Sequence, residues 1–282
     1  MFQINWKLKA FLYKFLEFFK LRTFVYFLQK HVTKRSQIDI TNSKHLWEGH
    51  KNTLKKYNCK TLLEIGAGKS LEQNIFFSYF FNNKINQTTI DINKMLDFDL
   101  FNKASLQISK YYNFEYKGEV KTINEIFRNY NISYRAPCSI EDIIKDNLKF
   151  DITVSTTTLE HFSIRDLRHY LGNLTKILKN DGFFSALIDY TDHYSHTDKN
   201  ISVLNYLSFN EDKWKKFNNS FLYQNRLRHQ DYVRIFYEFN LNIIELKKGK
   251  KIKPPVIISQ DFDKNNTDTF VSSGYFLGKI LS

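Results

Sequence analysis

The sequence is poor in the residues that build small secreted scaffolds and linkers. Its 282 residues include only two cysteines and three prolines. Cys59 and Cys138 cannot form a disulfide framework, so we expect reduced thiols in a cytoplasmic protein. Three prolines leave no room for a Pro-rich linker. No apolar run approaches the ~20 residues that a transmembrane helix needs. Lysines also interrupt the apolar residues of the first twenty positions, which excludes a signal peptide from our expectation.

Acidic residues are scarce near the N-terminus. Residues 1–60 hold thirteen Lys and Arg against three acids, so +10 of the net charge of +13 lies there. The other 222 residues carry only about +3. A nucleic-acid enzyme would need a basic cleft in its catalytic core, so nucleic acid is not the partner that we expect. The charge instead predicts a local contact of the N-terminal extension.

What the chain does contain is a strand, a glycine turn and a helix in direct succession. Residues 61–65 form a short apolar run, Gly66, Ala67 and Gly68 follow, and residues 71–77 have a helical pattern. Glycines permit a sharp turn and bring backbone N–H groups close to a ligand. The following helix directs its positive end to the same place. This succession is typical of nucleotide-binding α/β sheets.

Two acidic residues strengthen this interpretation. Glu64 lies inside the first strand, and Asp91 ends a second predicted strand at residues 88–91. A carboxylate at that distance can accept hydrogen bonds from both ribose hydroxyls of an adenosine. The sequence therefore predicts a nucleotide cofactor.

Glu64-Ile65-Gly66-Ala67-Gly68, with Asp91 at the end of the next strand, resembles the motifs of the class I S-adenosylmethionine-dependent methyltransferases. The resemblance covers about residues 60–280. One departure is that Cys138 and Ser139 stand where the family commonly has an acid for the adenine amino group, and Ser139 is the substitute that we expect. The cofactor-binding residues that the resemblance implies are Glu64, Gly66, Ala67, Gly68, Asp91, Ile92, Ser139, Ser155 and Glu160.

The expected fold is a doubly wound, mostly parallel seven-stranded sheet, a Rossmann-like methyltransferase fold with a basic helical N-terminal extension. Residues 1–58 are the extension and residues 59–282 the methyltransferase domain, with a lid-like insert at about 190–228. The further strands expected are residues 131–136, 150–155, 183–188, 241–246 and 269–277. The helices expected are residues 2–20, 42–57, 100–111, 122–130, 163–178 and 229–239, and residues 179–182 are read as a helix stop.

Histidines gather in two loops that the topology brings to the same edge of the sheet. Leu159-Glu160-His161 follows the fourth strand and resembles a run of the family, and His193 and His196 follow the fifth. Transfer of a methyl group to a hydroxyl needs a base, and imidazole titrates nearest neutrality. His193, His161 and His196 are the candidate bases, with Asp192 or Glu160 to orient them. A divalent metal could also be bound by Asp189, Asp192, His193, His196 and Asp198. The spacing of three between His193 and His196 suits a helix better than a loop, so no metal is expected.

Within the family, the sequence looks most like bacterial methyltransferases of surface-polysaccharide biosynthesis. That resemblance implies a hydroxyl of a glycan or glycan precursor as the acceptor. Tyr194 and the run Asn225-Arg226-Leu227-Arg228 are the expected substrate-binding residues, the guanidinium groups of Arg226 and Arg228 holding a phosphate or carboxylate.

Residues 2–20 form a basic amphipathic pattern, with Leu8, Phe11, Leu12, Phe15, Leu16 and Phe19 on one face. Residues 24–32 continue it. This composition is typical of helices at a membrane surface, which would bring residues 2–35 to anionic lipid at the inner membrane face. The helix could equally pack on the core or on a second copy in a homodimer.

Two rival functions stay open. A nicotinamide-dependent oxidoreductase would use Asp91 equally well, although Glu64 and Ser70 depart from its glycine pattern. A non-catalytic binding protein on a methyltransferase scaffold is the other.

Overall fold

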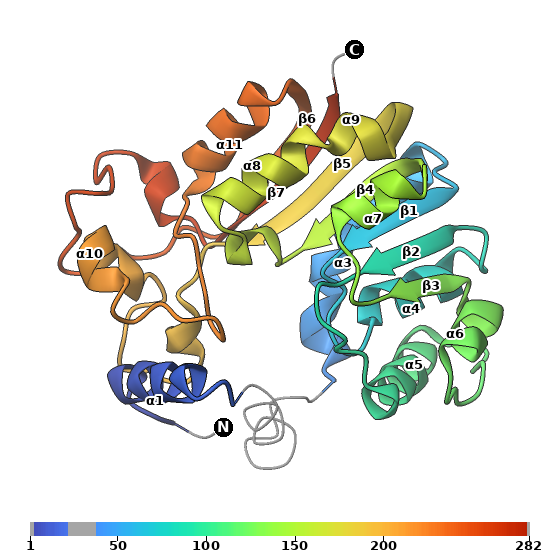
Figure 1. Cartoon of the computed structure of the whole chain (residues 1–282), viewed down its shortest axis with the longest axis horizontal. Coiled ribbons are helices and arrows are strands. Elements are labelled where there is room, and N and C mark those ends of the chain that lie inside the picture. The colour runs from blue at the N-terminus through green and yellow to red at the C-terminus, as the bar shows by residue number, and fades with distance from the viewer. Residues whose placement is uncertain (1–2, 22–37, 281–282) are drawn as a thin grey trace.

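A computed structural model of the chain describes residues 3–21 and 38–280. It contains one seven-stranded sheet in the order β3-β2-β1-β4-β5-β7-β6, in which only β7 runs antiparallel to its neighbours (Figure 1). The strands are β1 Thr61–Ile65, β2 Asn86–Ile90, β3 Ile132–Arg135, β4 Phe150–Thr156, β5 Leu178–Asp189, β6 Leu241–Lys248 and β7 Ser273–Ile280. The predicted doubly wound, mostly parallel seven-stranded sheet is confirmed.

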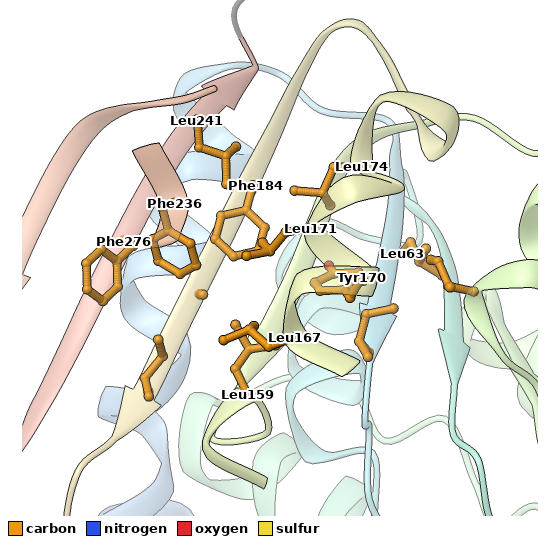
Figure 2. Close-up of a cluster of buried hydrophobic side chains, with 14 of the residues drawn as sticks. Leu63, Leu159, Leu167, Tyr170, Leu171, Leu174, Phe184, Phe236, Leu241 and Phe276 are labelled. Carbon is orange, nitrogen blue, oxygen red and sulfur yellow. The ribbon is translucent and has the colours of Figure 1, made fainter. Parts of the chain in front are cut away.

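Helices cover both faces of this sheet. The bounds are α3 Ile40–Lys56, α4 Glu72–Phe80, α5 Phe98–Tyr112, α6 Ile123–Tyr130, α7 Ile140–Lys145, α8 Ile164–Gly172, α9 Leu174–Ile177 and α11 His229–Glu238. Helices α3 to α6 pack in one buried cluster, and α7, α8, α9 and α11 pack in another. Neighbouring β1 residues divide between the two faces, Leu62 in the first cluster and Leu63 in the second, because side chains of a strand alternate. Figure 2 shows the second cluster, where Leu167 and Leu171 approach Phe184 from α8.

Several predicted bounds were wrong. The expected helix stop at residues 179–182 is part of β5, which begins at Leu178, because the turn after α9 continues directly into the pairing with β4. The helix before the first strand is capped by Asp39, whose carboxylate accepts the Asn42 N–H, and not by Asn42 or Ser43. Helix α7 was not predicted, and β7 begins at Ser273 after a 3₁₀ turn at Thr267–Phe270.

The remaining elements form a third buried cluster beside the sheet. It joins α1 Trp6–Phe18 to 3₁₀ turns at His193–His196 and Asn205–Ser208, to α10 Glu211–Trp214 and to the 3₁₀ turn that holds Phe270. Trp6 lies at its centre, with ring centroids 4.6 Å from Phe217 and 5.6 Å from Tyr194. The Trp6 backbone N–H donates to the Asp198 carboxylate at 2.9 Å. The first helix therefore belongs to the packing of the insert at residues 190–228, and we name this cluster the aromatic lobe (Figure 1).

Helix α1 docks on the aromatic lobe with the face opposite to its Leu and Phe residues. Trp6, Lys9 and Ala10 are buried, while Leu8, Phe11, Phe15 and Phe18 are 51–81% exposed. The apolar face of this helix, predicted from the sequence, is therefore exposed and does not pack on the core. No described helix has both the length and the apolar character to cross a membrane. The predicted continuation at residues 24–32 lies outside the described residues.

Candidate active site

A cavity of about 540 Å³ opens at the carboxyl ends of β1, β2, β3 and β4. The chain reverses its strand order between β1 and β4, which is where open α/β sheets bind ligands. The cavity is lined by Ile65, Gly66, Ile90, Asp91, Ile92, Asn93, Cys138, Ser139, Ile140, Glu141, Thr158, His161, Phe162, Asp166, His169 and Tyr170.

The glycine turn after β1 has the conformation that requires glycine. Gly66 and Gly68 have φ angles of +77° and +73°, a region that side chains rarely adopt. A Cβ on Gly66 would collide with the Thr158 side chain. A Cβ on Gly68 would meet no described atom within 4 Å. The turn thus holds Gly66 tightly and leaves open space above Gly68 for a ligand.

Asp91 and Ile92 follow β2 and face the same cavity. The Asp91 carboxylate accepts the Asn93 N–H at 2.9 Å. Burial raises the pKa of Asp91, and backbone N–H groups of Asn93 and Gly68 partly oppose the rise. The Ile92 side chain is 76% exposed, which is unusual for isoleucine and suits the flat face of an adenine. These two residues combine a carboxylate for hydroxyls with an apolar platform for a base.

Glu64 lies beneath the turn, buried in β1. Its Oε1 accepts the Gln73 amide at 2.9 Å, while Oε2 has no hydrogen-bond partner among the described residues. Burial raises the pKa of this carboxyl to about 7, with the Asn74 side chain opposing the rise. A buried carboxyl oxygen without a partner is costly, so the position favours a donor supplied by a ligand.

A chain of buried polar groups continues from Glu64 across the sheet. The Gln73 oxygen accepts from the Thr156 hydroxyl at 2.8 Å, which lies 3.1 Å from His50 Nε2. The other nitrogen of His50 lies 2.7 Å from the Ser185 hydroxyl. Burial lowers the pKa of His50 to about 3, so its ring is neutral. These hydrogen bonds fix the Gln73 amide that holds Glu64. They could not be predicted from local sequence, because Gln73, Thr156, His50 and Ser185 come from four different elements.

Ser139 and Ser155 do not share one environment. Ser139 lines the cavity, but its hydroxyl donates to the Asp142 carboxylate at 3.1 Å at the start of α7. Ser155 is fully buried inside β4 and is not among the cavity-lining residues. The Ser155 hydroxyl therefore lies too deep in the sheet for the cofactor contact that was expected.

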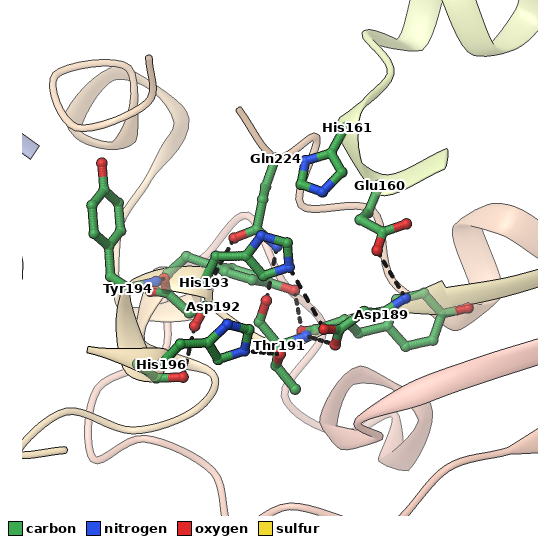
Figure 3. Close-up of polar contacts among 12 residues, drawn as sticks. Glu160, His161, Asp189, Thr191, Asp192, His193, Tyr194, His196 and Gln224 are labelled. Carbon is green, nitrogen blue, oxygen red and sulfur yellow. Dashed lines mark hydrogen bonds and ion pairs between the residues drawn. The ribbon is translucent and has the colours of Figure 1, made fainter. Parts of the chain in front are cut away.

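The two predicted histidine loops meet beside the cavity (Figure 3). The rings of His161 and His193 are 4.9 Å apart, and His196 stacks on His193 at 5.1 Å. His161 Nδ1 lies 2.6 Å from the Tyr223 carbonyl oxygen, which can only accept, so Nδ1 carries the proton and Nε2 is a free acceptor. The Glu160 side chain is buried next to them, and its Oε1 accepts the Asp189 N–H at 3.3 Å.

The protonation states in this cluster follow from the protein atoms and charges around each group. His161 is an exposed residue on the cavity wall, yet the protein atoms around its ring, followed by the neighbouring His193, lower the pKa of His161 to about 4. Burial and His193 likewise lower the pKa of His196 to about 4. Burial raises the pKa of Glu160 well above its usual value, with Asp189 adding to the effect. At neutral pH the two histidines are therefore neutral.

Asp192 and Tyr194, predicted to act at the site, face the aromatic lobe instead. The Asp192 carboxylate is fully buried and accepts the Tyr194 N–H at 2.8 Å and the Asn205 amide at 3.0 Å. Burial raises the pKa of Asp192 to about 6. The Tyr194 hydroxyl donates to the Phe217 carbonyl at 2.7 Å. Both residues hold the turn that carries His193, and neither reaches the cavity.

The structure gives Arg226 and Arg228 a structural role in place of the expected substrate contact. Buried Arg228 donates to the carbonyl oxygens of Thr269, Tyr190 and Val271, each at 2.8 Å. Buried Arg226 donates to the Phe209 carbonyl and pairs with Glu211 at 2.6 Å. Their guanidinium groups are hydrogen-bonded within the protein, so they are not available to an acceptor.

Asn225, the remaining predicted substrate-binding residue, joins the loop after β4 to the aromatic lobe. Its amide donates to the Leu159 and Phe162 carbonyl oxygens at 2.9 and 3.1 Å. Its backbone N–H donates to the Glu160 carbonyl at 2.9 Å. Asn225 therefore positions the Glu160-His161 turn and does not face the cavity.

No family model and no curated protein matches this chain. Solved structures do resemble it. One is the 1,6-didemethyltoxoflavin-N1-methyltransferase of Burkholderia thailandensis, solved with 1,6-didemethyltoxoflavin and S-adenosylhomocysteine, with 10% identity, a TM-score of 0.47, and 91% of this chain and 86% of that chain covered. A SAM-dependent methyltransferase from Archaeoglobus fulgidus is similar at 12% identity and a TM-score of 0.43, with coverage of 83% and 94%. An S-adenosylmethionine-dependent methyltransferase from Clostridium acetobutylicum ATCC 824 is similar at 12% identity and a TM-score of 0.41, with coverage of 93% and 99%.

Proposed function

We propose that this protein transfers a methyl group from S-adenosylmethionine to a hydroxyl of a polar acceptor. The observation that carries the proposal is the cavity itself. It joins Gly66 of the glycine turn to the Asp91 carboxylate, the exposed Ile92 side chain and the free nitrogen of His161. These groups suit a nucleoside cofactor on one side and a reacting hydroxyl on the other.

The residues of the cavity fit the parts of this cofactor. Asp91 would accept from the ribose hydroxyls and Ile92 would pack on the adenine. The unpartnered Oε2 of Glu64 would accept from the ammonium of the methionine part. The bound cofactor supplies a methyl group on a sulfonium, which a nucleophile displaces in line.

This chain contributes position and proton transfer. Helix α8 and the turn at Leu159–His161 hold His161 at the cavity wall, and the Tyr223 carbonyl sets its tautomer. A neutral imidazole nitrogen facing the cavity can accept the proton of a hydroxyl as the oxygen is methylated. His161 therefore takes the role of base in this proposal, with His193 behind it. General bases of this kind contribute typically 10²–10⁴-fold.

A glycan or glycan precursor is the acceptor class that we propose. Its support is the sequence resemblance and the polar rim of the cavity, where Asp166 and His169 accompany His161. The aromatic lobe does not add to it, because Tyr194, Tyr206 and Trp214 are buried.

Calorimetric titration with S-adenosylmethionine, S-adenosylhomocysteine and NAD tests the cofactor. We expect the two sulfur ligands to bind and Asp91→Ala to weaken both by about 10–100-fold, since charge-assisted hydrogen bonds contribute about 1.5–3 kcal/mol each. Asp99→Ala, on the exposed side of α5, is the matched control. Binding of NAD alone would favour an oxidoreductase and refute the proposal.

We also propose that α1 brings the protein to an anionic membrane surface. Phe11, Phe15 and Phe18 are 68%, 51% and 81% exposed on the face turned away from the aromatic lobe. Residues 1–60, to which α1 belongs, carry +10 of the net charge of +13. Exposed Phe and Leu flanked by Lys suits the boundary of headgroups and acyl chains.

Flotation of the protein with vesicles tests this location. We expect binding to vesicles rich in phosphatidylserine, weaker binding to phosphatidylcholine vesicles, and loss of binding on replacing Phe11, Phe15 and Phe18 by serine. Phe127→Ser removes an equally exposed ring from α6 and should have no effect. A dimer in solution that the triple variant dissociates, with no flotation, would show instead that a second copy covers this face.

A further inference from the structure

We propose that Glu160, His161 and His193 form a binding site for a divalent transition-metal cation such as Zn²⁺ or Co²⁺. One ligand atom from each of the three residues lies within 4.8 Å of the others. Two imidazoles and one carboxylate are the ligand set of catalytic zinc and of non-haem iron sites. Metal binding was not expected from the sequence, because the spacing of three between His193 and His196 suits a helix better than a loop, and Glu160 and His161 come from a different loop.

The first argument is a carboxylate oxygen without a partner. Glu160 is 3% exposed, and its Oε2 has no hydrogen bond among the described residues. Its Oε1 accepts only the Asp189 N–H, at 3.3 Å. An oxygen buried in this way costs free energy unless a donor or a cation approaches it.

The second argument is the arrangement behind the two histidines. Metal-binding histidines nearly always donate the other ring N–H to a carbonyl or carboxylate. His161 Nδ1 donates to the Tyr223 carbonyl oxygen at 2.6 Å, which leaves Nε2 as a ligand. One ring nitrogen of His193 lies 3.6 Å from the Asp189 carboxylate. The His161 ring is thus held as in a metal ligand and the His193 ring lies beside a carboxylate, and Figure 3 shows Glu160 and His161 approaching His193 from the opposite loop.

The third argument is how firmly these ligands are held. The Asn225 amide fixes the Glu160-His161 turn through two carbonyl oxygens. The Gln224 side chain accepts the His193 N–H at 3.0 Å and donates to the Thr191 carbonyl at 2.8 Å. The two loops are therefore joined by a single segment, residues 224–225. A closing movement of about an ångström brings ligand atoms to normal coordination distances.

Of the residues weighed from the sequence, Asp192 and Asp198 are committed to the aromatic lobe. Asp192 accepts from Tyr194 and Asn205, and Asp198 from Trp6 and Asn200. Among the described residues this leaves one group of three ligands, and His161 connects it with the cavity.

This inference deepens the proposed function and rests on it only for its role in the reaction. A cation here would bind the acceptor oxygen directly and lower the pKa of its hydroxyl. The hydroxyl proton would then leave to water, the oxygen would form the bond to the methyl carbon, and the bond from that carbon to sulfur would break. In the cation-loaded protein, His161 is a ligand and no longer the base.

Direct metal binding is the test, made on the full chain after EDTA treatment and dialysis. We expect Co²⁺ to bind in a 1:1 ratio with visible d–d absorption, Zn²⁺ to displace it, and Mg²⁺ not to compete. Glu160→Gln and His193→Ala should each weaken Co²⁺ binding at least 10-fold, whereas His196→Ala, which removes the stacked neighbour, should leave it within about threefold. Thermal unfolding of each variant without metal checks that it is folded.

Several outcomes overturn the inference. One is that the folded wild-type chain does not bind Co²⁺. Another is that wild type and both ligand variants bind Co²⁺ equally. A third is a sulfur-to-cobalt charge-transfer band, which would place the ion at Cys59 or Cys138. Titration of S-adenosylmethionine on the same sample keeps the two proposals apart. Cofactor binding without Co²⁺ binding refutes the cation site alone, and Co²⁺ binding without cofactor binding refutes the proposed function alone.

Discussion

Binding of S-adenosylmethionine should release a proton from Glu64. Burial raises the pKa of this carboxyl to about 7 in the unliganded protein, so at pH 6 it is about 90% protonated. The α-ammonium of the ligand is fully charged at that pH, since α-amino groups titrate near 7.7–8.0. If the ammonium meets the unpartnered Oε2, the carboxyl must ionise. We therefore expect about 0.9 protons to be released per ligand at pH 6.

The release is measured by calorimetry at pH 6 in buffers of different ionisation enthalpy, where the slope of apparent enthalpy gives the number of protons. Glu64→Gln should abolish it. The fragment 5′-methylthioadenosine lacks the methionine amino group and should release none. Equal slopes for wild type and Glu64→Gln would refute the contact. So would proton release by the fragment.

The same carboxyl sets a pH dependence of stability in the unliganded protein. Its folded pKa is raised above the unfolded value, so Glu64 favours the unfolded state as pH rises from about 4.5 to about 7. That shift corresponds to a loss of about 3 kcal/mol, complete above pH 7. The free energy of unfolding of wild type should therefore fall between pH 4.5 and pH 8, and that of Glu64→Gln should fall less. Urea unfolding at both pH values measures the two differences. An unchanged difference would refute the buried, neutral carboxyl.

Two further predictions concern the scaffold of the site. Arg228→Ala should lower the free energy of unfolding by about 3–5 kcal/mol, because it leaves the carbonyl oxygens of Thr269, Tyr190 and Val271 without their charged donor. Arg234→Ala, at an exposed ion pair, should cost less than about 1 kcal/mol. Similar melting temperatures for the two would contradict the role of Arg228. Gly66→Ala should destabilise the protein more than Gly68→Ala, because both positions have positive φ but only the first substitution adds a clash with Thr158. Both substitutions should weaken S-adenosylmethionine binding. Equal stability of the two variants would show that Thr158 moves aside.

The parts of the fold that are local in sequence could be predicted. The glycine turn, Glu64 and Asp91 lie at the ends of two short strands, and β-strand pattern and turn chemistry suffice to find them. The β5 start was missed because residues 179–182 look like a helix stop. In the structure they form an irregular stretch of β5 between Leu178 and Phe183, which pair with Phe150 and Ile152 of β4. Local pattern does not contain that information.

The roles of the polar residues depended on tertiary contacts. Arg226, Arg228 and Asp192 are residue types that usually face solvent or ligand, so the sequence predicted binding. Their burial follows from the packing of α1 and the insert, which no local pattern reveals. The meeting of Glu160 and His161 with His193 was predicted from topology. The burial of Glu160 was not, because an oxygen without a partner among the described residues is visible only in three dimensions.

The docking of α1 has a consequence for the order of events during synthesis. The helix is translated before its partners, because Asp198 and Thr197 come 192 and 188 residues after Trp6 and Lys9. A contact of such high separation can form only after most of the chain has left the ribosome, and long-range contacts form late in folding. The nascent helix therefore exposes Trp6 as well as its outer phenylalanines until the lobe is complete. We expect the growing chain to need a chaperone or a lipid surface during this interval, and a circular permutant that joins α1 to the C-terminal half to fold faster than the natural order.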